Sequence, residues 1–132
     1  MKKLLYLFFA ISLFSCSSDD DSNQTFLERY ADIVWEATGS GGLRNSFNLN
    51  GFTQKNEECF VYIWGIENPN TGKTWNLLEN NYDNLVINLE IDGTIDFTST
   101  ITISEDENTI TEYIVEEEIY TAVRTSLSNP CN

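Results

Sequence analysis

Apolar and polar side chains alternate over residues 85–103, on both sides of a central Asp92-Gly93 pair. A period of two is typical of a β-strand with one buried and one solvated face, and Asp-Gly is typical of a two-residue type I′ hairpin turn. The pattern therefore predicts an antiparallel hairpin. The positions that it assigns to the buried face are Leu85, Ile87, Leu89, Ile91, Ile95, Phe97, Ile101 and Ile103.

Runs of β-branched and aromatic residues, separated by turn residues, occupy most of the chain from residue 34 onward. One short helix is predicted ahead of them over 25–33, where Thr25 and Glu28 form a capping-box pattern. The glutamates at 116–118 form either a tight turn or a bend within one long strand. The other predicted strands begin at Val34 or cover 43–49, 59–66, 74–78, 109–115 and 119–125.

These elements predict an all-β domain over residues 25–132 with seven or eight antiparallel strands in sequential order after the short helix. Parallel strands are excluded because the sequence contains no crossover helices. The connections are short, which favours a small up-and-down β-barrel. A two-sheet sandwich is the alternative, because each strand of a sandwich also has one buried and one wet face.

Residues 1–15 have the pattern of a signal peptide rather than of a folded element. A basic start, Met1-Lys2-Lys3, precedes an apolar run over 4–14 that is too short to span a bilayer. The run ends at Leu13-Phe14-Ser15-Cys16, which resembles the bacterial lipobox. The resemblance implies that Cys16 is lipidated and becomes the first residue of the mature protein. The alternative is cleavage at another site, with Cys16 incidental.

Residues 16–24 are polar and acidic and have nothing to bury, so we expect a flexible tether. Asp19–Asp21 resemble the acidic stretch after the lipidated cysteine in surface-exposed lipoproteins of Bacteroidetes. In those proteins the stretch directs export to the outer face of the outer membrane. The resemblance implies a lipid-anchored cell-surface protein, and a solvated spacer is the alternative.

The chain has three cysteines, and the lipobox accounts for one of them. If Cys16 carries the lipid, Cys59 and Cys131 remain as one pair. Export would place them in an oxidising compartment, where a disulfide persists. Two free thiols are the alternative, and two cysteines without histidine are a poor metal site.

Composition narrows the range of functions. Acidic residues outnumber basic ones 21 to 7, giving a formal net charge of −14, so nucleic-acid binding is not expected. The chain has no histidine, which excludes Ser-His and Cys-His nucleophile pairs and metal sites with imidazole ligands. We expect no catalytic residues and no cofactor.

The segment from Phe26 through Tyr30 into Val34-Trp35 resembles the opening of small lipocalin-like lipoproteins of Bacteroidetes. The end of the chain, with Tyr120 and Arg124, resembles the last strand of such a barrel. The resemblance implies that Trp35 plugs one end of the barrel and pairs there with Arg124. It also implies a non-enzymatic domain that binds small ligands or acts by contact.

Three candidate sites have a structural alternative. Strand aromatics can line a ligand cavity or fill the core. Asp92 and Asp96 could act as a carboxylate pair, but a hairpin tip is an exposed place for one. Asp19–Asp21 and Glu116–Glu118 lack the spacing of a calcium loop. The aromatic residues expected at a cavity are Phe60, Tyr62, Trp64 and Trp75.

The sequence alone favours an interaction module that is anchored to the membrane through lipid on Cys16 and contacts an unknown protein partner. Binding of a small neutral apolar or sugar-like ligand in the barrel is the alternative, and the ligand would enter at the end away from Trp35. A carboxylate-dependent hydrolase is the third candidate.

Overall fold

The computed structural model describes residues 23–39, 41–129 and 131 and is almost entirely β-structure. The predicted signal peptide, the lipidation site Cys16 and the acidic run at 19–21 lie outside the described residues. The elements are α1 (Phe26–Arg29), β1 (Val34–Ala37), β2 (Arg44–Asn48), β3 (Gly51–Lys55), β4 (Cys59–Ile63), β5 (Glu67–Asn68), β6 (Lys73–Asn80), β7 (Asn84–Ile91), β8 (Thr94–Ile103), β9 (Thr109–Ile114) and β10 (Glu117–Thr125).

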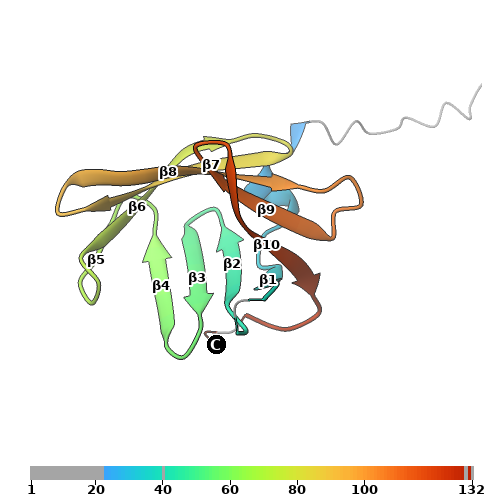
Figure 1. Cartoon of the computed structure of the whole chain (residues 1–132), viewed down its shortest axis with the longest axis horizontal. Helices are drawn as coiled ribbons and strands as arrows, with labels where there is room; N and C mark the ends of the chain where they lie inside the picture. The colour runs from blue at the N-terminus through green and yellow to red at the C-terminus, as the bar shows by residue number, and fades with distance from the viewer. Residues whose placement is uncertain (1–22, 40, 130, 132) are drawn as a thin grey trace, which may run out of the picture.

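All strands belong to one antiparallel sheet in the order β4-β3-β2-β1-β10-β9-β8-β7-β6-β5. The first and last strands of the chain are neighbours, because β1 pairs with β10 over Val34–Ala37. Figure 1 shows β1–β4 side by side as one wall, β6–β9 crossing over them, and β10 bending between the two. The sheet thus curls into a nearly closed barrel, which confirms the barrel prediction and excludes the two-sheet sandwich.

The seam of the barrel lies between β4 and the β5–β6 hairpin. Two hydrogen bonds cross it in place of a regular ladder. The Gly65 N–H donates to the Trp75 carbonyl at 2.8 Å, and the Asn68 side-chain amide donates to the Val61 carbonyl at 3.0 Å. The barrel is therefore closed here by a turn and a side chain rather than by strand pairing.

The predicted count of seven or eight strands is wrong, because the sheet has ten. Two strands were missed. One is β3, where Gln54 and Lys55 follow Phe52 and Thr53 and the apolar pattern is too brief to mark a strand. The other is β5, which is only two residues long.

Two hairpin turns use residues with positive φ. Asp92 and Gly93 have φ of 52° and 75°, which confirms the predicted two-residue turn between β7 and β8. The sequence left open whether residues 116–118 form a turn or a bend in one strand. A tight turn between β9 and β10 is formed by Val115 and Glu116, with φ of 51° and 66°. Glu117 and Glu118 belong to β10.

Two residues assigned to the buried face are exposed. Ile91 and Ile95 are 37% and 58% exposed. A β-bulge next to Leu89 pairs Ile95 with Glu90, which turns Ile95 to the outer face. Ile91 keeps the inward register, but it lies at the end of the β7–β8 hairpin, where β8 has no register with β9 before Ser99. The hairpin therefore runs past the rest of the barrel wall, and Ile91 has little to pack against.

The α1 helix closes one end of the barrel. The Thr25 N–H donates to Glu28 Oε2 at 2.8 Å, and the Leu27 N–H donates to the Asn80 side chain at 3.0 Å. Phe26 and Leu27 are fully buried. In the part of the chain that the structure describes, no helix is long and apolar enough to cross a membrane.

Arg29 fastens the helix to two loops on the same end. Its guanidinium pairs with Glu107, donates to the Tyr82 carbonyl at 3.0 Å and lies 3.7 Å from the centre of the Tyr82 ring. Tyr30 packs beside it, and burial raises the pKa of its hydroxyl to about 12. The helix therefore plugs this end of the barrel, and Arg29, Tyr30 and Tyr82 also line a pocket of about 320 Å³ beside it.

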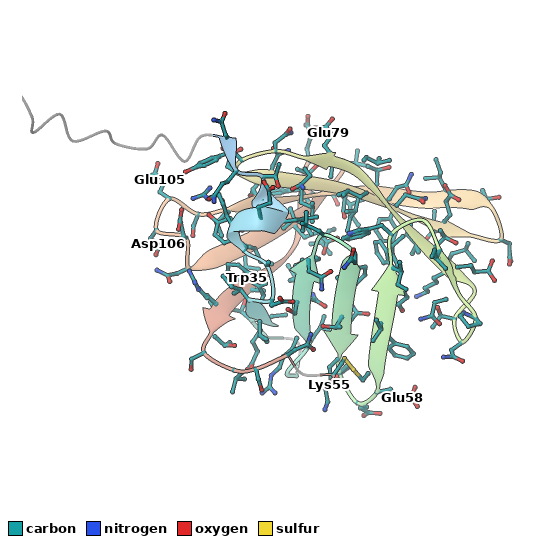
Figure 2. All side chains as sticks on the ribbon, turned by 180° about the vertical axis from the view of Figure 1, so that it is seen from behind. Trp35, Lys55, Glu58, Glu79, Glu105 and Asp106 are labelled. Carbon is teal, nitrogen blue, oxygen red and sulfur yellow. A yellow bond between two sulfur atoms is a disulfide. The ribbon has the colours of Figure 1, made fainter. Side chains whose placement is uncertain are left out.

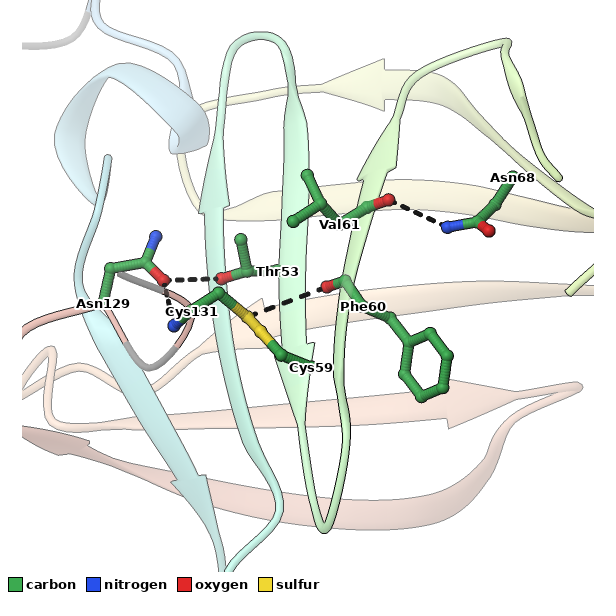
Figure 3. The surroundings of a disulfide bond; sticks show 7 residues. All are labelled: Thr53, Cys59, Phe60, Val61, Asn68, Asn129 and Cys131. Atoms are coloured by element: carbon green, nitrogen blue, oxygen red, sulfur yellow. Dashed lines mark hydrogen bonds between the residues drawn. A yellow bond between two sulfur atoms is a disulfide. The ribbon is translucent and has the colours of Figure 1, made fainter. Parts of the chain in front are cut away.

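The C-terminal segment returns to the outer surface of the barrel. Cys131 is disulfide-bonded to Cys59 at the start of β4, with Cα atoms 5.7 Å apart, which confirms the predicted pair (Figure 3). The Asn129 side-chain oxygen accepts hydrogen bonds from the Thr53 hydroxyl at 3.3 Å and from the Cys131 N–H at 2.9 Å. The segment is thus held against β3 and β4.

Candidate functional site

Among the described residues, no helix covers the end of the barrel opposite α1, and we call it the open end. On the inward face of β8, Ile101 and Ser99 are 1% exposed, whereas Phe97, farther from the helix, is half-buried. Ile103 lies at the α1 end of β8, because its N–H donates a hydrogen bond to the Asp83 carbonyl, next to the loop that the helix contacts. The inward side chains near Phe97 therefore border the mouth of the barrel.

Four polar side chains lie just inside this mouth, and we call them the polar quartet: Asn45, Ser99, Glu112 and Tyr120. Glu112 and Tyr120 are opposite each other in the β9–β10 register. Asn45 reaches them from β2, where its Nδ2 donates to the Tyr120 hydroxyl at 2.8 Å. Ser99 comes from β8, which pairs with β9 on its other side. The barrel thus brings a side chain of β2 to three consecutive strands near the end of the chain.

The quartet is incompletely hydrogen-bonded. Asn45 and Ser99 are only 3% and 1% exposed, yet Asn45 Oδ1 and Ser99 Oγ have no hydrogen-bond partner of good geometry. Leaving a buried donor or acceptor unpaired costs about 1 to 3 kcal/mol, and native structures rarely tolerate it. Orphaned polar atoms behind a half-buried carboxylate indicate a site that a polar ligand group or water completes.

Glu112 is a carboxylate in an unfavourable place for charge. Burial raises its pKa above the ordinary value of 4.5 for a glutamate, and hydrogen bonds from the neighbouring hydroxyls of Ser99 and Tyr120 lower it in part. In the described chain, no basic side chain contributes to this pKa. Burial and the Glu112 charge together raise the pKa of Tyr120, so its hydroxyl stays protonated at neutral pH.

The raised pKa of Glu112 gives a stability prediction with a defined sign. The folded protein holds the Glu112 proton more tightly than the unfolded chain, so this residue lowers stability as pH rises from about 4.5 through the raised value. Glu112→Gln should be more stable than the wild type at pH 7, and this advantage should shrink toward pH 4. Urea denaturation of both proteins at several pH values tests this.

The titratable group that faces Glu112 from the neighbouring strand is Tyr120, which does not ionise in this range. Glu28 and Asp106 have lowered pKa values and act in the opposite direction, but both proteins contain them. The difference between the two proteins therefore isolates Glu112. An advantage for Glu112→Gln that is independent of pH would contradict the assignment.

Aromatic rings cover the inner wall beside the quartet. Phe60 and Tyr62 have ring centres 6.3 Å apart, and Trp75 lies 6.2 Å from Tyr62 and 5.7 Å from Phe97. Phe60, Trp75 and Phe97 are half-buried, and the Trp75 indole N–H is buried without a partner. Three of the four aromatics named from the sequence therefore border the mouth or the wall next to it.

Trp64, the fourth, has a structural contact. Its indole N–H donates to the Asn48 carbonyl at 3.2 Å, and its ring packs 5.4 Å from Phe52. Asn48 also stabilises the turn that follows β2, because its side-chain oxygen accepts a hydrogen bond from the Asn50 N–H at 2.9 Å. Trp64 thus ties the end of β4 to the β2–β3 turn.

Trp35 and Arg124 are opposite each other in the β1–β10 register. Trp35 is fully buried beside α1, with its ring centre 6.1 Å from that of Tyr30 (Figure 2). Arg124 is exposed. The strands bring the two residues to the same level, but only the tryptophan is part of the plug.

The carboxylates considered for catalysis or calcium lie elsewhere. Asp92 and Asp96 are exposed at the β7–β8 hairpin, and Glu116–Glu118 are exposed at the β9–β10 turn and the start of β10. Among the residues that the structure describes, no three His, Cys, Asp or Glu side chains are grouped to hold a metal ion.

The sequence contains a signal for two members of the quartet. Glu112 interrupts the alternation of Ile110 and Ile114, and Ser99 stands between Phe97 and Ile101 on the same face. Polar residues at apolar-face positions of predicted strands are candidates for an internal site. Asn45, which hydrogen-bonds to Tyr120, does not interrupt a regular apolar alternation in this way.

Comparisons of the chain with known protein families, with curated proteins and with solved structures find no match. The site is therefore interpreted from its own geometry.

Proposed function

We propose that this protein binds a small amphipathic molecule at the open end of its barrel. The observation that carries the proposal is the buried Asn45 Oδ1, which has no hydrogen-bond partner, behind the half-buried Glu112 and Tyr120. Aromatic rings at the same end of the barrel supply an apolar wall, and an apolar wall with a few convergent polar groups is typical of ligand-binding sites. This favours the ligand hypothesis over the contact function that the sequence alone put first.

A ligand screen tests this proposal. We expect at least one class among neutral, cationic and anionic small aromatics and lipids to raise the melting temperature in a concentration-dependent way. Ser99→Val should weaken that effect at least tenfold, because it removes a polar atom of the site. Thr98→Val, an equivalent change on the exposed side of β8, should leave it unchanged. If no class shifts the melting temperature or the NMR resonances of the mouth residues, the contact module is favoured instead.

The lipobox-like sequence supports a second part of the proposal, that the protein acts as a lipid-anchored protein of the outer membrane surface. We expect Cys16→Ser to abolish labelling with radioactive palmitate and to move the protein from the membrane fraction to the soluble fraction. Ser17→Ala, next to it, should do neither. A Cys16→Ser protein that stays labelled and membrane-bound would show that the anchor is elsewhere.

A further inference from the structure

The geometry points to an organic ammonium cation as the ligand, with Glu112 as its counter-ion; this inference rests on the proposed function of the open end. It assigns a ligand class that differs from the neutral apolar or sugar-like molecule expected from the sequence. Three independent features of the mouth carry it: the direction of its free hydrogen bonds, the unpaired carboxylate and the aromatic wall.

The free hydrogen-bonding capacity of the quartet is mainly that of acceptors. Asn45 uses one of its two amide N–H groups on the Tyr120 hydroxyl, whereas its acceptor Oδ1 has no partner. An ionised Glu112 accepts only, and the Ser99 hydroxyl can do either. A ligand that completes this group must therefore bring donors, and an ammonium group brings up to three.

The charge at the site has the matching sign. A half-buried carboxylate is stabilised by a cation, and no basic side chain of the described chain contributes to the Glu112 environment. Arg29 and Arg44 are already paired with Glu107 and Glu36. The formal net charge of −14 also attracts cations and repels anions before contact.

The aromatic wall adds an attraction that a neutral ligand would not use. Phe60, Trp75 and Phe97 are half-buried at the mouth. A cation over an aromatic face gains about 0.5 to 2 kcal/mol, more when it is removed from water. A carboxylate and half-buried aromatic rings at the same end of the barrel thus suit an ammonium group attached to a small apolar body.

Three indole compounds of similar size and different charge provide the test: tryptamine, tryptophol and indole-3-acetate are cationic, neutral and anionic at pH 7. We expect tryptamine to bind the full domain at least ten times more tightly than tryptophol by calorimetry or NMR titration. Indole-3-acetate should bind most weakly. Glu112→Gln should reduce tryptamine affinity to the level of tryptophol. Glu118→Gln, which removes the same charge from an exposed position of β10, should change it less than twofold.

The outcomes separate the two proposals. Equal binding of tryptamine and tryptophol would overturn the cation assignment and leave the amphipathic ligand site intact. An equal loss of tryptamine binding in both glutamine variants would show attraction by overall charge and would also overturn it. Failure of all three compounds, and of the wider screen, would overturn both proposals. A Glu112→Gln protein of lower stability than the wild type at pH 7 would show that Glu112 serves the fold instead.

Discussion

Trp35→Ala should lower the free energy of unfolding by about 3 to 5 kcal/mol, the usual cost of truncating a buried tryptophan. Trp35 is fully buried, and it supports Tyr30 and therefore the α1 plug. Since a small domain has only about 5 to 15 kcal/mol in total, the melting temperature should fall by more than about 10 °C. Urea denaturation and thermal melting followed by circular dichroism measure both quantities.

Trp35→Phe is the matched control. It keeps an aromatic ring in the plug and removes an indole N–H that has no hydrogen-bond partner, so we expect a much smaller loss. If Trp35→Ala melts within a few degrees of the wild type, the plug does not depend on this side chain, and the expected role of Trp35 is wrong.

Removing the disulfide should have an effect of similar size. Cys59 and Cys131 are 72 residues apart, and in the chain-entropy model a loop of this length stabilises the folded state by about 4 kcal/mol. The Cys59→Ala/Cys131→Ala double variant should therefore unfold at markedly lower urea concentration than the oxidised wild type. The same shift is expected when the wild type is unfolded with a reductant.

Asn129→Ala separates the covalent bond from the contacts around it. This variant keeps the disulfide but loses the hydrogen bonds from the Thr53 hydroxyl and the Cys131 N–H, so its cost should be nearer 1 kcal/mol. A double cysteine variant that costs no more than Asn129→Ala would mean that the bond adds nothing beyond local contacts.

The β7–β8 hairpin could be predicted because its signals are local. Alternation over residues 85–103 and the Asp92-Gly93 turn require no knowledge of the rest of the chain. The exposure of Ile95 could not be predicted in this way, because it depends on a β-bulge in the β7–β8 register that turns this residue to the outer face. Alternation gives the face of a residue only while the register is regular.

The candidate site depends on contacts that no local pattern contains. Asn45 meets Tyr120 across 75 positions in the sequence, and their hydrogen bond follows from the β1–β10 pairing that closes the barrel. The aromatics could be named as wall residues because a strand rich in rings is visible in the sequence. Their position relative to Glu112 required the curvature of the whole sheet.

The pairing of β1 with β10 also determines the order in which the fold can be completed. Val34 pairs with Thr125, so the neighbour of the first strand is among the last parts of the chain to be synthesised. Until β10 arrives, one edge of β1 is unpaired, and the sheet cannot curl around its core. Contacts between such distant segments form slowly, because a long loop must close before they stabilise anything. We therefore expect truncations before residue 117 to leave an open sheet with an exposed edge that is prone to aggregate.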